Sequence, residues 1–239
     1  MDRYKVIPAD DNLFMIEEDM VRSFLLVGSK KALLIDTGCM LSDIKSIIES
    51  ITDLPVILAN THADRDHISC NHQFEAIYIH PSEYASYHNN VKRNDHLIPL
   101  WEGDSFDLGD RKVIALFNPG HSQGCMTFFD EKGRRLIGGD SIQSGRVFMF
   151  GPHRDLLAYL HTMRRMESYM DRIDVIFPSH AECPVKADII PKLADGVEAI
   201  IDGKISEYRE EELMGIPIRV YDIGVAQILF DGHRGFFEE

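Results

Sequence analysis

Residues 61–67 read Thr-His-Ala-Asp-Arg-Asp-His and place four potential metal ligands within six positions. The apolar run Pro55–Ala59 just before them has the length of a buried β-strand. In an extended segment the side chains of His62, Asp64 and Asp66 point to one side, and His67 turns inward where a short helix is expected to begin. Neutral imidazole and ionised carboxylate bind Zn²⁺ or harder ions such as Fe²⁺ and Mn²⁺. The stretch therefore predicts a metal site at the end of a strand.

Three further residues of the same chemical kinds follow other apolar runs. His121 stands in Asn-Pro-Gly-His-Ser-Gln-Gly, Asp140 in Ile-Gly-Gly-Asp-Ser, and His180 in Phe-Pro-Ser-His-Ala-Glu. Each lies shortly after a predicted strand, where loops collect functional groups. A lone His or Asp in such a loop is usually a solvated or capping residue. The ordered series beginning at His62 instead favours one shared site.

The series resembles the signature of the metallo-β-lactamase superfamily: His-x-His-x-Asp-His, then Pro-Gly-His, then Gly-Asp, then Ser-His or Gly-His. The stretch Leu34-Ile35-Asp36-Thr37-Gly38 also fits, so the resemblance extends from there through Ser179-His180 and covers most of the chain. It implies an α+β or α/β fold, namely the superfamily's four-layer αββα sandwich, with a dinuclear metal site along one edge between two sheets.

The resemblance also implies two ligand sets joined by a bridging carboxylate. The first metal would be bound by His62, His121 and the residue at position 64, the second by Asp66, His67 and His180, and Asp140 would bridge the two. Asp66 would in addition orient the nucleophile, which makes it the predicted catalytic residue. Asp36 matches the family's early Asp and is expected to orient ligands or to be structural. No substrate-binding residue is indicated.

Position 64 departs from the family pattern, because it holds Asp where the family usually has its second His. Three carboxylates and a bridging hydroxide would neutralise two divalent ions, whereas the usual two carboxylates leave one positive charge. A less positive centre is a weaker Lewis acid, and the added carboxylate favours harder metals. We therefore expect two divalent ions, zinc or iron, with manganese as a further candidate. The alternative is a site that holds metal poorly.

The hydrophobic pattern predicts short strands separated by helices. Strands are expected at 12–17, 22–27, 32–35, 55–59, 76–79, 112–117, 127–129, 135–137, 175–177, 218–221 and 225–230, and helices beginning near Leu41, His67, Pro81, Asp155 and Pro191. Residues 89–99 read as a polar excursion. The sequence has no internal repeat and no Pro/Ser-rich linker, so a single domain over residues 1–239 is expected.

Composition excludes several classes of partner. The 239 residues contain 25 Lys+Arg against 39 Asp+Glu, a formal net charge of −14. A nucleic-acid binder that relies on a broad basic surface is therefore excluded, and binding to an anionic membrane is disfavoured. The first twenty residues lack an apolar stretch of signal-peptide length, and the four cysteines are scattered, which predicts a cytoplasmic protein with reduced thiols. The expected partner is a small-molecule substrate; the oligomeric state is not indicated.

Three functions remain open. The resemblance implies a metal-dependent hydrolase similar to the glyoxalase II-like members of the superfamily. In such a hydrolase a metal-bridging hydroxide attacks a small ester, thioester or lactone. Asp64 leaves a second function possible, that of a di-iron redox protein that reduces dioxygen or nitric oxide with a separate electron donor. The di-iron members of the superfamily carry Glu at this position. The third is a non-catalytic scaffold with a degraded site. Substrate specificity would reside in loops 89–103 and 143–154.

Overall fold

Residues 4–232 are described by a computed structural model, in which the chain divides into two units. The first unit contains the residues up to Phe117 together with 126–137, and the second contains 118–125 and the residues from Gly138 onward. The chain therefore passes between the units more than once. The expectation of one domain over residues 1–239 stays a prediction, and its ends lie outside the described residues.

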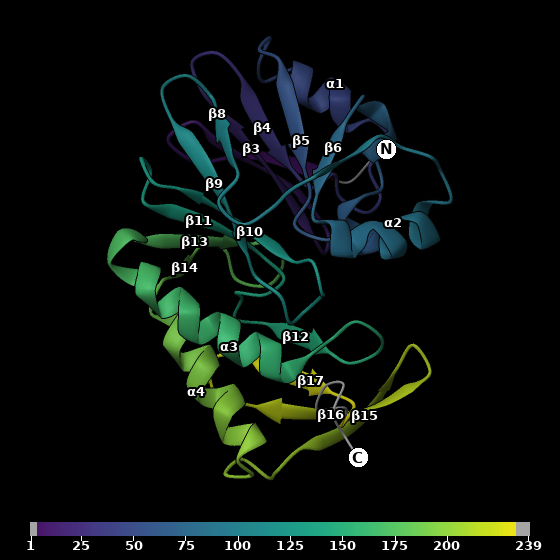
Figure 1. The fold of residues 1–239 in the computed structure, drawn as a ribbon, viewed down its shortest axis with the longest axis vertical. Coiled ribbons are helices and arrows are strands. Elements are labelled where there is room, and N and C mark those ends of the chain that lie inside the picture. The colour runs from purple at the N-terminus through teal and green to yellow at the C-terminus, as the bar shows by residue number, and fades with distance from the viewer. Residues whose placement is uncertain (1–3, 233–239) are drawn as a thin grey trace. The chain divides into compact units, whose positions relative to one another are not determined.

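The first unit is built on a seven-stranded sheet (Figure 1). Its strands, in both chain and spatial order, are β1 (Tyr4–Asp10), β2 (Leu13–Glu18), β3 (Arg22–Val27), β4 (Ala32–Ile35), β5 (Val56–Ala59), β6 (Ile77–Ile79) and β7 (Leu97–Pro99). β1 to β4 form an antiparallel meander, whereas β4 to β7 run parallel. The residues that follow β4, β5, β6 and β7 therefore emerge at one edge of the sheet.

Two helices make the crossovers that parallel strands require. α1 (Ile44–Glu49) connects β4 to β5, and α2 (Tyr84–Val91) lies between β6 and β7. Asp43 begins α1 by accepting a 3.0 Å hydrogen bond from the Ser46 amide. The buried faces of both helices pack with β4, β5 and β6 in one apolar cluster. Short 3₁₀ turns at Arg65–His67, Asn71–Gln73 and Pro81–Glu83 complete the connections.

Four further strands form an antiparallel run that packs on this sheet. They are β8 (Ser105–Asp107), β9 (Lys112–Phe117), β10 (Met126–Asp130) and β11 (Arg135–Gly139). Every residue of β10 is buried, and the Met126 amide donates to the Thr61 carbonyl at 2.8 Å. The rings of Phe106 and Tyr78 meet edge to face at 5.3 Å. β11 leaves the first unit after Ile137.

The second unit holds a four-stranded sheet and two long helices. The sheet has the order β12 (Arg146–Met149), β17 (Gln227–Phe230), β16 (Ile216–Asp222), β15 (Arg209–Leu213). α3 (Leu156–Met166) packs against α4 (Ile189–Ile201) and presents buried Leu160, Met163 and Met166. The remaining elements are the 3₁₀ helix Glu167–Arg172 and the paired strands β13 (Val175–Pro178) and β14 (Val185–Lys186).

Most predicted elements are confirmed, and the differences have physical causes. The strands at 22–27, 32–35 and 112–117 have the predicted bounds. The helix expected to begin near Asp155 is α-helical from Leu156 to Met166 and continues as a 3₁₀ helix to Arg172. Strands β1, β7, β8, β12, β14 and β15 are not predicted by the hydrophobic pattern. β15 reads Arg-Glu-Glu-Glu-Leu, a charged sheet-edge strand, and β7 lies within the segment interpreted as a polar excursion.

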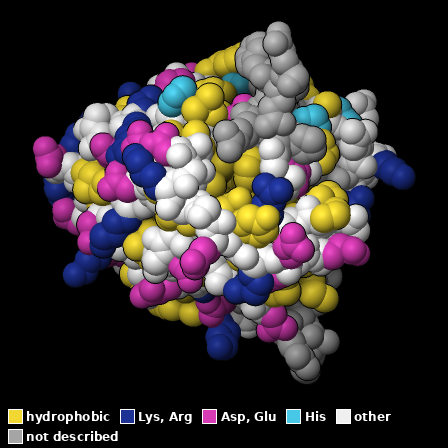
Figure 2. Space-filling view, turned by 90° about the horizontal axis from the view of Figure 1, so that it is seen from below, with side chains coloured by type: hydrophobic (Ala, Val, Ile, Leu, Met, Phe, Trp, Pro, Cys, Tyr) yellow, Lys and Arg dark blue, Asp and Glu magenta, His cyan; other side chains and the backbone are white. Residues whose placement is uncertain are grey.

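Charged side chains of both signs lie on the surface. Figure 2 shows acidic and basic side chains interspersed over one face of the molecule. Among residues 4–232, no helix combines the length and the apolar character needed to cross a membrane.

A buried ion cluster joins the β1–β2 turn to the second sheet of the first unit. The Asp130 carboxylate lies 3.1 Å from Arg111 Nη1 and 3.0 Å from Arg135 Nη2, and all three side chains are almost fully buried. Arg135 also donates to the Asp11 carbonyl at 2.8 Å. Asp130 is the buried counterion of both guanidinium groups, whereas Asp10 (3.0 Å from Arg135 Nη1) and Asp11 (3.4 Å from Arg111 Nη2) are largely exposed.

Replacing Asp130 with Asn should lower the free energy of unfolding by about 3 kcal/mol, because it removes the buried counterion of two buried guanidinium groups and leaves them only exposed carboxylates. Urea unfolding measures the change. Asp188→Asn is the control, since Asp188 pairs with Lys192 at 2.8 Å, both side chains are exposed, and the change should cost less than about 1 kcal/mol. Equal losses in the two variants would contradict this role for Asp130.

Candidate metal centre

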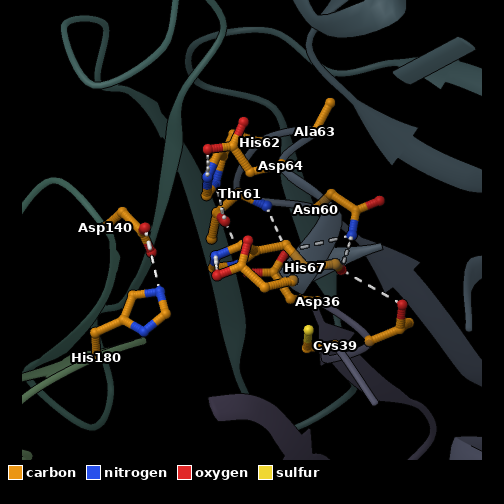
Figure 3. Close-up of polar contacts among 12 residues, drawn as sticks. Asp36, Cys39, Asn60, Thr61, His62, Ala63, Asp64, His67, Asp140 and His180 are labelled. Carbon is orange, nitrogen blue, oxygen red and sulfur yellow. Dashed lines mark hydrogen bonds and ion pairs between the residues drawn. The ribbon is translucent and has the colours of Figure 1, made fainter. Parts of the chain in front are cut away.

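The carboxylate of Asp36, directly after β4, is the centre of the polar network in the first unit. Asp36 is fully buried and adopts φ +63°, a left-handed conformation. Its Oδ1 accepts hydrogen bonds from the Thr61 amide (2.8 Å) and Asn60 Nδ2 (3.2 Å). Its Oδ2 accepts from Thr61 Oγ1 (2.7 Å) and His67 Nδ1 (2.8 Å) (Figure 3). One carboxylate therefore holds both ends of the ligand-rich segment.

Buried amides extend this network around the His67 backbone. Asn60 Nδ2 and the Thr37 amide both donate to the His67 carbonyl, at 3.2 and 2.8 Å. Asn71 donates to Asn60 Oδ1 at 2.7 Å and accepts from Thr37 Oγ1 at 2.7 Å. All of these polar side chains are buried. The loop after β4 and the segment after β5 are therefore fixed to each other.

Glu18 on β2 fixes the loop that follows Asp36. Its carboxylate accepts hydrogen bonds from the amides of Cys39 (2.8 Å) and Met40 (2.6 Å). Gly38 makes this approach possible, because it has φ +73° and a Cβ there would lie 1.8 Å from Glu18 Oε1. The pKa of the neighbouring Cys39 thiol is raised by burial and by the negative charge of Asp66, so the neutral thiol is favoured at this position.

Gly38→Ala should lower the free energy of unfolding by more than about 3 kcal/mol, because it combines left-handed strain with a collision at a buried carboxylate. Chemical denaturation measures the loss. Gly203→Ala separates the two effects, since Gly203 has φ +71° with open space around it and should cost only about 1–2 kcal/mol. If the Gly38 variant were as stable as the Gly203 variant, the Glu18 contact would not be what requires glycine at position 38.

The contacts at Nδ1 define the tautomers of the two buried histidines in the first unit. Asp36 Oδ2 can only accept, so a neutral His67 carries its proton on Nδ1. Thr61 Oγ1 gives its single proton to Asp36, and its 2.9 Å contact with His62 Nδ1 is therefore donated by His62. Both rings then carry the lone pair on Nε2, the atom that can bind a metal.

Each of these Nε2 atoms faces a carboxylate of the same segment. His62 Nε2 lies 3.5 Å from Asp64 Oδ2, and His67 Nε2 lies 3.6 Å from Asp66 Oδ2. The two imidazole rings are 4.2 Å apart between centroids. The loop carrying them is held at Ala63, whose amide donates to buried Glu83 at 2.9 Å. The first unit thus gathers four of the predicted ligands.

The second unit fixes His121 in the same way. His121 Nδ1 lies 2.9 Å from the Phe148 carbonyl, which can only accept, so the lone pair of the neutral ring is again on Nε2. Helix α3 holds the preceding turn: Thr162 Oγ1 donates to the Pro119 carbonyl at 2.7 Å. A Cβ at Gly120, which has φ +142°, would lie 2.5 Å from the Cα of Tyr159. Only glycine lets this turn lie against α3.

Asp140 and His180 complete the predicted residues of the second unit. Asp140 Oδ2 lies 3.2 Å from His180 Nε2 and 3.6 Å from His121 Nε2 (Figure 3 draws the first contact). The buried Tyr159 hydroxyl donates to the Ser141 carbonyl at 2.6 Å, and the Ser179 amide donates to Gly139 at 3.1 Å. Within this unit, the structure therefore brings three residues from separate loops together.

The supporting polar residues were not singled out by the sequence analysis. Asn60, Thr61 and Asn71 precede or follow the ligand-rich segment, and Glu18 and Glu83 are distant from it in sequence. The roles of Asn60 and Thr61 could have been predicted from one signal, a polar Asn-Thr pair directly after a buried strand. Nothing in the local pattern distinguishes Glu18 or Glu83 from surface carboxylates.

Comparison with known proteins identifies the family. The family model described as the metallo-beta-lactamase superfamily matches residues 16–180. The chain belongs to the metallo-β-lactamase superfamily. The human acyl-coenzyme A thioesterase MBLAC2 is 23% identical over 260 residues, which cover 88% of this chain and 93% of that protein. A hydroxyacylglutathione hydrolase of Gloeobacter violaceus is 23% identical over 139 residues, covering 57% and 50%.

Solved structures agree with the family. A metallo-beta-lactamase from Pontibacter korlensis superposes with a TM-score of 0.69 at 15% identity, covering 82% of this chain and 99% of that one. At this level of identity the likeness concerns the fold alone. The predicted α+β sandwich of the superfamily is confirmed.

Proposed function

We propose that this protein is a metal-dependent hydrolase that cleaves a small thioester. The observation that carries the proposal is the set of three buried histidines whose Nδ1 contacts place the lone pair on Nε2, opposite a carboxylate oxygen. Two relatives support the reaction class, because they are named as an acyl-coenzyme A thioesterase and a hydroxyacylglutathione hydrolase. Esters and lactones present the same reacting carbonyl and belong to the same proposal.

The donor set fits divalent metal ions. Two ligand atoms about 2.1 Å from a tetrahedral ion lie about 3.4 Å apart. The Nε2–carboxylate distances within each unit are 3.2–3.6 Å. We assign the ligands on family membership together with this geometry. The residues that would hold two ions are His62, Asp64, Asp66, His67, His121, Asp140 and His180, and the family resemblance would assign Asp140 to both ions.

Bound ions would supply Lewis acidity and a hydroxide nucleophile at neutral pH. The residues of the chain do the rest. Asp66 is partly exposed and faces His67 Nε2, so it can orient the attacking water and accept its proton. Asp36 keeps the His67 proton on Nδ1, which leaves Nε2 directed towards Asp66. The leaving thiolate needs little protonation, because a free thiol has a pKa of about 8.5.

A second candidate function is di-iron redox chemistry with a separate electron donor. The observation that favours it is Asp64, whose carboxylate oxygen faces His62 Nε2 at 3.5 Å where the family pattern has a second imidazole. A carboxylate at this position favours harder ions such as Fe²⁺ over Zn²⁺. Metal content and the products of turnover separate the two candidates.

Asp66→Asn should lower kcat/KM for thioester hydrolysis at least about 100-fold, because the amide cannot accept the proton of the attacking water. The assay follows thiol release from S-acetyl-N-acetylcysteamine by metal-replete protein. Asp53→Asn changes an exposed carboxylate outside the proposed site and should leave the rate unchanged. An Asp66 variant with near-normal turnover and unaltered folding would refute the assignment.

Asp64→His should raise the ratio of zinc to iron, because it replaces a hard ligand with imidazole. Elemental analysis of wild type and variant, both purified without added metal, gives the ratio and the number of ions per chain. Two equivalents of zinc alone in the wild type would contradict the proposed preference for a harder metal. Two equivalents of iron without thioester turnover would favour the redox candidate.

A further inference from the structure

Two aromatic residues follow β6 and β7, the next two strands after β5, on the same sheet edge as the ligand-rich segment. His80 follows β6 and Trp101 follows β7 after one intervening residue, Leu100. The Asn60 amide donates to the Tyr78 carbonyl at 2.8 Å, and the Leu100 amide donates to the Ile79 carbonyl at 3.1 Å. Neighbouring strands are about 4.8 Å apart, so the end of β7 lies about 10 Å from the end of β5.

Three rings in contact and two backbone links connect Trp101 to the segment beside His62. The indole of Trp101 meets the His80 ring edge to face at 5.0 Å, and His80 stacks on Phe117 at 4.5 Å. Phe117 pairs across the sheet with Met126, and the Met126 amide donates to the carbonyl of Thr61. Thr61 immediately precedes His62. The backbone therefore ties the inner ring, Phe117, to the strand that contacts Thr61, and the outer ring, Trp101, is exposed to solvent.

Trp101 is exposed although its backbone is firmly held. The residue is 52% exposed. Its amide donates to Asp104 Oδ2 at 2.8 Å, and its carbonyl accepts from the Asp104 amide at 3.1 Å. Gly103 donates to the Ala115 carbonyl, and Glu102 accepts from the Phe117 amide. An ordered turn thus presents a large apolar ring to water, which is typical of a binding surface.

The ring surface is uncharged at neutral pH. Burial lowers the pKa of His80 below its ordinary value, so its imidazole is neutral where it supports the indole. The buried His80 ring and Phe117 lie behind the indole and support it, so the exposed apolar surface is that of Trp101. An exposed indole binds an apolar chain by removing it from water.

We infer that Trp101 and the rings behind it bind the apolar acyl chain of the substrate and make the protein selective for longer acyl groups. This inference rests on the proposed thioester hydrolysis and names the substrate class more narrowly. The reacting carbonyl would lie near the His62 segment, and the chain would extend along the sheet edge to the exposed indole of Trp101. A chain of about eight carbons spans the 10 Å between the strand ends, whereas an acetyl group does not.

The binding test uses the intrinsic fluorescence of the protein, because Trp101 is the only tryptophan in the sequence. The probes are two thioethers that lack a reacting carbonyl, S-octyl- and S-methyl-N-acetylcysteamine. The octyl probe should shift the emission to shorter wavelength with saturation, and the methyl probe should not. A response to neither probe, or an equal response to both, would overturn the inference. This readout needs no turnover, so it stands even if the proposed hydrolysis fails.

The kinetic test compares octanoyl and acetyl thioesters of N-acetylcysteamine. Trp101→Ala should reduce kcat/KM for the octanoyl thioester about tenfold more than for the acetyl thioester. A tenfold difference is the effect expected when the octanoyl chain loses roughly 60 Å² of apolar contact with the indole. Trp101→Phe should restore most of the difference. Met214→Ala removes another exposed apolar side chain and should alter neither rate. Equal losses for both thioesters in Trp101→Ala would contradict a role in chain selection.

Discussion

A buried carboxylate that accepts four hydrogen bonds determines the arrangement of the first unit's site. Asp36 is fully buried, and burying an ionised carboxylate is costly unless its oxygens are satisfied. All four donors come from Asn60, Thr61 and His67. The carboxylate is tolerated because the segment after β5 surrounds it, and that segment is ordered because the carboxylate is there. The positions of His62 and His67 follow from this mutual dependence.

The second unit achieves the same result with helix α3 in place of a carboxylate. Tyr159 and Thr162 each donate to a carbonyl in a separate loop, one beside Asp140 and the other two residues before His121. Both loops are therefore held in place by the same helix. In both units, ring orientation is set by a partner at Nδ1, and this makes Nε2 the atom that can coordinate a metal.

The parts of the structure that depend on local pattern were predictable from sequence. The strand at 32–35 is a continuous apolar run and the strand at 22–27 contains one from residue 24 onward, and the candidate ligands belong to spaced motifs that resemble those of a family. The charged edge strand β15 and the carboxylates of Glu18 and Glu83 were not predictable. Their roles arise from tertiary contacts: Glu18 binds two amides about twenty residues away, and Glu83 binds the Ala63 amide.

The most direct test of this account is NMR spectroscopy of ¹⁵N-labelled protein loaded with ¹¹³Cd, which detects the nitrogen bound to the metal through its coupling. The account predicts coupling to Nε2 of His62, His67 and His121, with a proton retained on each Nδ1. Coupling through Nδ1 of His67, or a His67 ring protonated on Nε2, would contradict the role assigned to Asp36.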